Sequence, residues 1–274
     1  MSILILTFMA IAIFISLVVW GTKGHRAINR GLRKISAIDA VTAAYSEGDY
    51  ETALHKSENL RTRLSKTAAY CFFRGSMLYH LGRFDDAEAS LREGLLMEEN
   101  PSQKALVYNT LASVFMEKGR YPEAITFFEN AGRAWPDRGA NHRGLAEVWL
   151  RQGREFPEAL EHARQAVEID RRATGLKKEA IDSRLGEDLA VLAWAVAVNS
   201  GNASEVESLL VEAMPLVGTK TKPTFAEVHY HAGRAYEALK ITEKSRDHLR
   251  QAMEADPKGI WGSLAQSIGS PPQS

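Results

Sequence analysis

A six-residue pattern, Gly-x-aromatic-x-x-Ala, recurs along this chain and constrains its fold more than any other feature. It occurs at Gly48–Ala53, Gly82–Ala87 and Gly119–Ala124, and in a looser form at Gly153–Ala159. The glycines are 34, 37 and 34 residues apart. Each lies between an apolar-periodic segment and an Ala-rich one, where the end of a helix needs a residue in the left-handed conformation. A repeat of this length predicts a stack of helical hairpins.

This pattern resembles the tetratricopeptide repeat family, whose 34-residue signature combines small, aromatic and proline positions at fixed offsets. A repeat that starts at Ala105 fits best, and one that starts at Ala226 fits nearly as well. Repeats from Ala68 and Gly139 fit in part, and one from Lys34 is degenerate. The signature residues of the best repeat are Ala112, Phe115, Ala124, Phe128, Ala131 and Pro136.

The resemblance implies an all-α, right-handed superhelical solenoid of about six helix-turn-helix repeats over residues 37–259. The period breaks between residues 173 and 187. The apolar segment 188–198 and a second helix over 204–214 predict a divergent fifth hairpin, and residues 177–198 are expected to form one long helix.

The C-terminal end departs from the repeat pattern. We expect residues 260–264 to form a short capping helix in which Trp261 covers the last apolar face. The final residues, 270–274, have the composition of a disordered tail. Residues 260–274 are therefore interpreted as a capping segment and tail.

An uncharged apolar segment of 19 residues, SILILTFMAIAIFISLVVW, occupies residues 2–20. As a helix it would be about 28 Å long, close to the thickness of a bilayer's hydrocarbon core. It lacks the basic start and the small-residue cleavage site of a secretory signal. We therefore expect residues 1–21 to be an uncleaved transmembrane anchor and residues 22–36 a basic connector. Lys and Arg flank only the C-terminal side, which predicts an N-terminus outside and repeats in the cytoplasm.

The balance of charged residues and the small number of cysteines argue against several classes of function. The chain has 34 Lys and Arg and 34 Asp and Glu, which gives no reason to expect a nucleic-acid partner. The lone Cys71 is expected to be a small buried residue. His229 and His231 lie on different faces of one helix, and His142 and His162 have no carboxylate to complete a metal site. We expect no metal, no cofactor and no enzymatic activity.

The family register assigns the first helix of each hairpin to the concave groove. The Lys and Asn clamp that some relatives use for a terminal carboxylate is absent, because Phe72, Phe73 and Leu106 occupy its positions. Arg143 beside Asn109 is a candidate for binding an acidic side chain, and the alternative is that these residues are simply the solvated inner face. The expected groove residues are Phe73, Ser76, His80, Asn109, Thr110, Ser113, Met116, Arg143, Glu147, Tyr230, His231 and Arg234.

The expected function is that of a membrane-anchored adaptor that binds a protein or peptide ligand in the groove. Two alternatives are open. In the first, the repeats self-associate to organise a membrane complex, with Leu189–Val198 as a homo-oligomer face, although burial of this segment within the fifth hairpin is the simpler interpretation. In the second, the chain is a regulatory subunit that docks on a membrane enzyme through Ser2–Trp20. In each case the protein positions other molecules.

Overall fold

The computed structural model describes residues 39–61, 67–217 and 222–269, and all regular structure in these ranges is helical. The expected anchor, connector and tail lie outside the described ranges. Within them, no helix combines the length and the apolar character that crossing a membrane requires.

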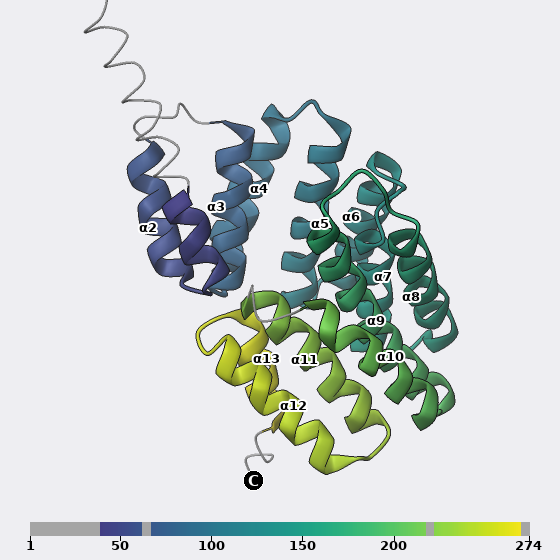
Figure 1. Ribbon diagram of the computed structural model, residues 1–274. Helices are drawn as coiled ribbons and strands as arrows, with labels where there is room; N and C mark the ends of the chain where they lie inside the picture. Colours follow the sequence, from purple (N-terminus) through teal and green to yellow (C-terminus); the bar gives the residue numbers. More distant parts are fainter. Residues whose placement is uncertain (1–38, 62–66, 218–221, 270–274) are drawn as a thin grey trace, which may run out of the picture.

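The helices follow one another as pairs joined by short turns (Figure 1). A helix over residues 39–46 precedes α2 (Tyr50–Arg61), α3 (Ala68–His80) pairs with α4 (Phe84–Met97), α5 (Pro101–Glu117) with α6 (Tyr121–Ala134), α7 (Ala140–Gln152) with α8 (Phe156–Arg171), α9 (Lys178–Ser200) with α10 (Ala203–Val217), α11 (Lys222–Ala238) with α12 (Thr242–Ala255), and α13 (Ile260–Gly269) closes the series. The expected long helix is confirmed as α9. The expected capping helix is α13, which continues five residues beyond the predicted end at Leu264.

The turn between the helices of a pair has the geometry that the recurring glycine predicts. Gly48, Gly82, Gly119 and Gly153 have φ angles of 75°, 69°, 70° and 68°. These values lie in the left-handed region, which glycine enters without the steric cost that a Cβ atom brings. In the sixth pair the same position is Lys240, which adopts a φ of 61°.

Small residues let the two helices of a pair approach closely. The alanines of the recurring pattern, Ala53, Ala87, Ala124 and Ala159, are all fully buried. At Gly75 in α3, a Cβ atom would lie 2.5 Å from Leu91 of α4. Helix pairs therefore interlock through a small side chain on one helix and a large one on the other.

The apolar segment of α9 belongs to the core. Leu189 and the residues up to Ala197 are buried, and they form a second hydrophobic cluster with α7, α8, α10 and α11. Burial within the fifth hairpin, the simpler of the two interpretations of Leu189–Val198, is therefore confirmed for residues 189–197, which are not available to a homo-oligomer face. The segment is apolar on every side because other helices surround it.

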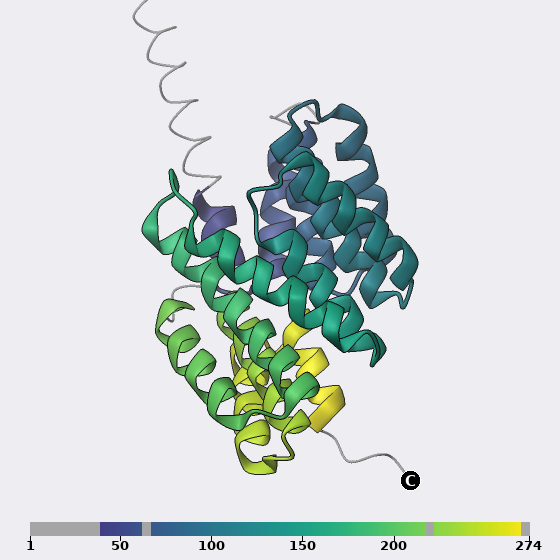
Figure 2. The same cartoon turned by 90° about the vertical axis from the view of Figure 1, so that its right-hand side faces the viewer.

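The two ends of the described array meet. In both views the yellow C-terminal helices lie directly below the purple and blue N-terminal ones (Figure 1, Figure 2). Lys222 of α11 forms an ion pair of 2.9 Å with Glu47, and one hydrophobic cluster joins Leu54 of α2 with Trp261 of α13. The helices at the two ends therefore close around the concave side of the solenoid.

Candidate binding site

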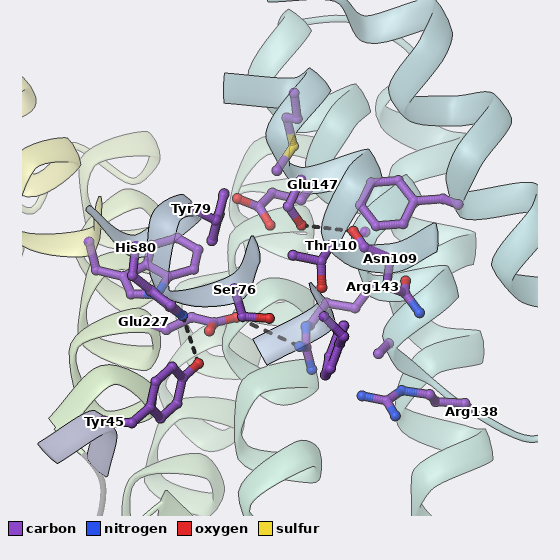
Figure 3. A pocket seen from close by; sticks show the side chains of 17 residues that line it. Tyr45, Ser76, Tyr79, His80, Asn109, Thr110, Arg138, Arg143, Glu147 and Glu227 are labelled. Carbon is purple, nitrogen blue, oxygen red and sulfur yellow. Dashed lines mark hydrogen bonds and ion pairs between the residues drawn. The ribbon is translucent and has the colours of Figure 1, made fainter. Parts of the chain in front are cut away.

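A cavity of about 250 Å³ lies on the concave side, where the early and late helices face each other (Figure 3). Its walls come from the helix over 39–46 and from α3, α5, α6, α7, α11 and α13, together with the turn before α7. The lining residues are Tyr45, Phe72, Ser76, Tyr79, His80, Asn109, Thr110, Ser113, Met116, Phe128, Arg138, Ala140, Arg143, Gly144, Glu147, Glu227 and Trp261.

Most of the groove residues expected from the register line this cavity. They are Ser76, His80, Asn109, Thr110, Ser113, Met116, Arg143 and Glu147. Four others do not line it. Phe73 is 60% exposed on α3, Tyr230 is buried against Trp261, His231 is fully buried, and Arg234 lies over the ring of Trp194. The repeat register therefore placed these four residues on helices that line the cavity, but their own side chains do not line it.

The wall made by α5 is polar, but its donors are already used. The hydroxyls of Thr110 and Ser113 donate to carbonyls of their own helix, at 3.1 and 3.2 Å. The amide nitrogen of Asn109 donates to the carbonyl of Ala105 and to Oδ1 of Asn141, the latter at 2.7 Å. The Oδ1 atom of Asn109 is buried and has no partner within the described residues. The polar groups of this wall named here are therefore either bonded within the chain or buried.

Aromatic rings form another side of the cavity. The hydroxyl of Tyr45 lies 2.9 Å from Nε2 of His80, and the His80 ring stacks on Tyr50 with centroids 4.5 Å apart. Burial lowers the pKa of His80 to about 4. The imidazole is therefore neutral near pH 7 and does not add a cation to the site.

Arg143 is held by three carboxylates of the same chain. Its guanidinium lies 2.7 Å from Glu187, 2.9 Å from Asp188 and 3.7 Å from Glu227. Its positive charge therefore already has partners within the chain, which argues against the prediction that Arg143 beside Asn109 binds an acidic side chain. The register could not show this, because Glu187 and Asp188 are supplied by the divergent helix α9.

Arg151 also forms ion pairs with more than one carboxylate. It lies 2.7 Å from Glu117 and 2.6 Å from Glu147, and His231 lies 3.4 Å from the same oxygen of Glu147. Burial alone would raise the pKa of Glu147, but Arg151 and His231 outweigh it and lower the pKa to about 2. Burial raises the pKa of Glu117. Glu147 is thus ionised at neutral pH.

A third group lies behind the cavity, between α8 and α9. Arg184 pairs with Asp170, which also accepts a hydrogen bond from the backbone nitrogen of Gly139 at 3.2 Å. Burial, with Asp170 and Glu187 nearby, raises the pKa of Asp188 to about 8 against the opposing effect of Arg143. Asp188 therefore retains a proton at neutral pH.

Arg138 was not expected from the sequence. It lines the cavity opposite Tyr45 and His80 (Figure 3), and its guanidinium lies 5.3 Å from the ring of Trp135. Within the described ranges it forms no ion pair, and its Nε atom has no hydrogen-bond partner. Burial, with Arg184 and Arg143 nearby, lowers its pKa to about 10. Because Arg138 lies in the turn before α7, no helix-position rule could have identified it.

Two histidine pairs lie outside the cavity. Nδ1 of His142 is 3.1 Å from Nδ1 of His162, and Nδ1 of His229 is 3.0 Å from Nδ1 of His248. Each pair links the two helices of a hairpin, and burial lowers the pKa of all four rings. The described part of the chain contains no group of three or more His, Cys, Asp and Glu that could hold a metal ion.

Comparison with protein-family models identifies the repeats. Three tetratricopeptide repeat models match residues 38–104, 103–172 and 226–258, which together make up more than half of the chain. The chain therefore contains tetratricopeptide repeats over these residues. A search of curated proteins found no match.

Solved structures give the same fold. The chain is similar to a subunit in the crystal structure of the APC/C hetero-tetramer Cut9–Hcn1, with a TM-score of 0.57, 17% identity and coverage of 85% of this chain and 42% of that one. It thus spans less than half of that structure's chain. The chain is also similar to BtubC from P. vanneervenii, with a TM-score of 0.48, 16% identity and coverage of 87% of this chain and 94% of that one. A further similar structure is YrrB, described as a TPR protein with an unusual peptide-binding site, with a TM-score of 0.37, 21% identity and coverage of 77% of this chain and 96% of that one.

Proposed function

We propose that this protein is an adaptor that binds a segment of a partner protein on the concave side of its repeats, at the cavity. The observation that carries this proposal is that one cavity is lined by helices from several repeats. The protein would act by positioning its partner and not by bond chemistry.

The stacking of the helices supports this mechanism. The cavity walls are held by the hydrophobic core and by the ion pairs of Arg143 and Arg151. Because the receptor is already ordered, a partner helix or extended segment would bind without the cost of ordering the receptor as well.

The test is crosslinked affinity purification of the full chain from its native cells, with mass spectrometry of the captured proteins. Ser76 is half-buried, lines the cavity and has no hydrogen bond in the structure, so Ser76→Tyr would fill the cavity without removing a bond. Ser208 is exposed on α10, and Ser208→Tyr is the matched control. We expect a partner that is lost with Ser76→Tyr and kept with Ser208→Tyr. Partners that both variants keep would contradict binding at the cavity.

We further propose that Ser2–Trp20 anchors the protein in a membrane, with the N-terminus outside and the repeats in the cytoplasm. This proposal rests on the apolar run and its one-sided basic flank, since these residues lie outside the described ranges. We expect the protein to remain in the membrane fraction after alkaline extraction. We also expect a protease to reach the repeats only from the cytoplasmic side. Release of the intact chain by alkaline extraction would contradict it.

A further inference from the structure

Arg138 lines the cavity without a partner for its charge. Within the described ranges its guanidinium forms no ion pair, whereas Arg143 at the same cavity lies within 3.7 Å of three carboxylates. Arg138 is half-buried in the turn before α7. A partly buried charge without a counterion costs free energy, so an anion that reached Arg138 would be stabilised there.

The charged groups around Arg138 do not neutralise it. Burial, the largest effect, and the nearby charges of Arg184 and Arg143 lower its pKa to about 10, against the opposing effects of Glu187 and Asp170. The guanidinium is therefore still charged near pH 7. Because the two arginines act on it more strongly than the two carboxylates, its surroundings are positive on balance.

The two carboxyl groups among the described lining residues do not compensate Arg138 either. Glu147 has its counterion in Arg151, at 2.6 Å. Burial raises the pKa of Glu227 well above its usual range, and the nearby Glu187 adds to this effect against the charge of Arg143. A carboxyl group with so high a pKa favours its neutral form. The positive charge of Arg138 is therefore the one left over at the cavity among the described residues.

The end of the Arg138 side chain is accessible to a ligand. Its Nε atom is enclosed, but its two terminal nitrogens are neither enclosed nor hydrogen-bonded within the described structure. Figure 3 shows the side chain at the edge of the cavity, on the side away from Tyr45 and His80. A guanidinium presents its N–H groups in a fixed planar fork that matches the two oxygens of a carboxylate.

The size of the cavity limits its occupant. Sites for drug-sized ligands measure roughly 300–1,000 Å³, whereas this cavity measures about 250 Å³. It therefore suits one side chain of a partner segment better than a whole helix. A side chain is also favoured over a chain end, because Phe72, Phe73 and Leu106 replace the clamp that some relatives use for a terminal carboxylate.

We infer that the cavity binds an aspartate or glutamate side chain of the partner segment, with its carboxylate held by the terminal nitrogens of Arg138. This inference rests on the proposed function and adds the chemical class of the partner. It moves the acidic side chain expected from the sequence from Arg143, which carboxylates of the chain already surround, to Arg138.

The test uses blocked peptides of the form acetyl-Gly-Gly-Xaa-Gly-Gly-amide, with Glu, Gln or Lys at the central position. A fourth peptide has Gln at the centre and a free C-terminal carboxylate. Each is titrated into the full chain in detergent micelles while NMR follows the five indole N–H signals. The Trp135 signal, assigned with Trp135→Phe, reports on the site because the Arg138 guanidinium lies 5.3 Å from the Trp135 ring.

We expect saturable shifts of the Trp135 signal with the Glu peptide. Its affinity should exceed that of the Gln peptide by about tenfold, the scale of one charge-assisted hydrogen bond. The Lys peptide should bind no better than the Gln peptide. Equal binding of the Glu and Gln peptides, or a preference for Lys, would overturn the inference. Binding of the free-carboxylate peptide as tightly as the Glu peptide would overturn the choice of a side chain over a chain end.

Variants of Arg138 test which residue holds the carboxylate. Arg138→Gln should reduce the affinity for the Glu peptide to about that of the Gln peptide, because it removes the charge. Arg138→Lys keeps the charge and loses the planar fork, so part of the preference for Glu should remain. Arg246 is exposed on α12, outside the cavity lining, and forms no ion pair in the described structure, so Arg246→Gln is the matched control and should leave the affinity unchanged.

A thermal unfolding scan confirms that these variants are folded. Unchanged binding of the Glu peptide in Arg138→Gln would overturn the role of Arg138. If Ser76→Tyr loses a native partner while the Glu peptide shows no preference, the adaptor stands and the acidic ligand is wrong. If Ser76→Tyr keeps all partners, the cavity is not the binding site, and the adaptor proposal falls with it.

Discussion

At the scale of single residues, Arg143 and Arg138 show how neighbours decide the role of a side chain. Both line the cavity, but Arg143 is surrounded by carboxylates of α9 and α11, whereas Arg138 has none as a direct partner in the described structure. The repeat register identified Arg143 because it lies on a first helix. It could not show that α9 neutralises it, because α9 belongs to the segment where the repeat pattern fails.

Lys240 carries a prediction at this scale. Its φ of 61° costs a residue that has a Cβ atom roughly 1–2 kcal/mol. Glycine avoids this cost, but it loses more conformational entropy on folding, which offsets part of the gain. We expect Lys240→Gly to raise the free energy of unfolding by about 0.5–1 kcal/mol in urea titrations. Gly119→Lys is the reciprocal control, since a Cβ at Gly119 would meet no atom within 4 Å, and it should lower stability by a similar amount. Destabilisation by Lys240→Gly would contradict this account.

At the scale of helices, much of the fold was predictable. The left-handed glycines, the buried alanines and the long helix α9 all follow from local patterns, because each depends on residues close in sequence. The end of α13 was less predictable. Local pattern indicated its start, but α13 also depends on contacts distant in sequence, since Trp261 packs against Tyr230 and His231 of α11.

Gly144 carries a prediction about helix packing. A Cβ on Gly144 of α7 would lie 2.1 Å from the ring of Phe128 on α6, so Gly144→Ala forces the two helices apart. We expect a loss of about 1–3 kcal/mol in the free energy of unfolding. Gly269 ends α13, and a Cβ there meets nothing within 4 Å. Gly269→Ala should therefore be neutral or stabilise by about 0.5 kcal/mol. If both substitutions changed the free energy of unfolding equally, the packing of α6 against α7 would not explain the effect of Gly144→Ala.

At the scale of the whole molecule, the decisive feature is that the two ends meet. Tyr45 and Trp261 line one cavity although more than 200 residues separate them. A repeat pattern describes how each hairpin packs on the next, and small rotations between neighbours accumulate along the array. The contact between first and last helices, and with it the cavity that they line together, was therefore beyond sequence reasoning.

The buried titratable groups predict how stability depends on pH. The folded chain holds a proton on Asp188 up to about pH 8, whereas the ordinary pKa of an aspartate is about 3.8, so the contribution of Asp188 to the free energy of unfolding falls as pH rises from about 4 to 8. Burial lowers the pKa of His80 and His229 to about 4 from the ordinary histidine value of 6.5. The unfolded chain therefore binds these protons first, and stability should also fall as pH drops below about 6.5.

Urea unfolding midpoints measured across this range should thus pass through a maximum near pH 6.5. Asp188→Asn should flatten the decline on the alkaline side, whatever its effect on the stability itself. A wild-type midpoint that rises steadily through pH 8 would show that Asp188 is ionised in the folded protein.

The most direct test of the central claim, that a partner binds inside the closed solenoid, is photo-crosslinking from the cavity itself. Thr110 lines the cavity and Thr126 is exposed on α6, so Thr110→Cys and Thr126→Cys form a matched pair for a thiol-reactive photo-crosslinker. The native Cys71 is 1% exposed and should react little. We predict that a partner segment crosslinks in native membranes from position 110 and not from position 126. Crosslinking from position 126 alone would place the partner outside the cavity and contradict the account.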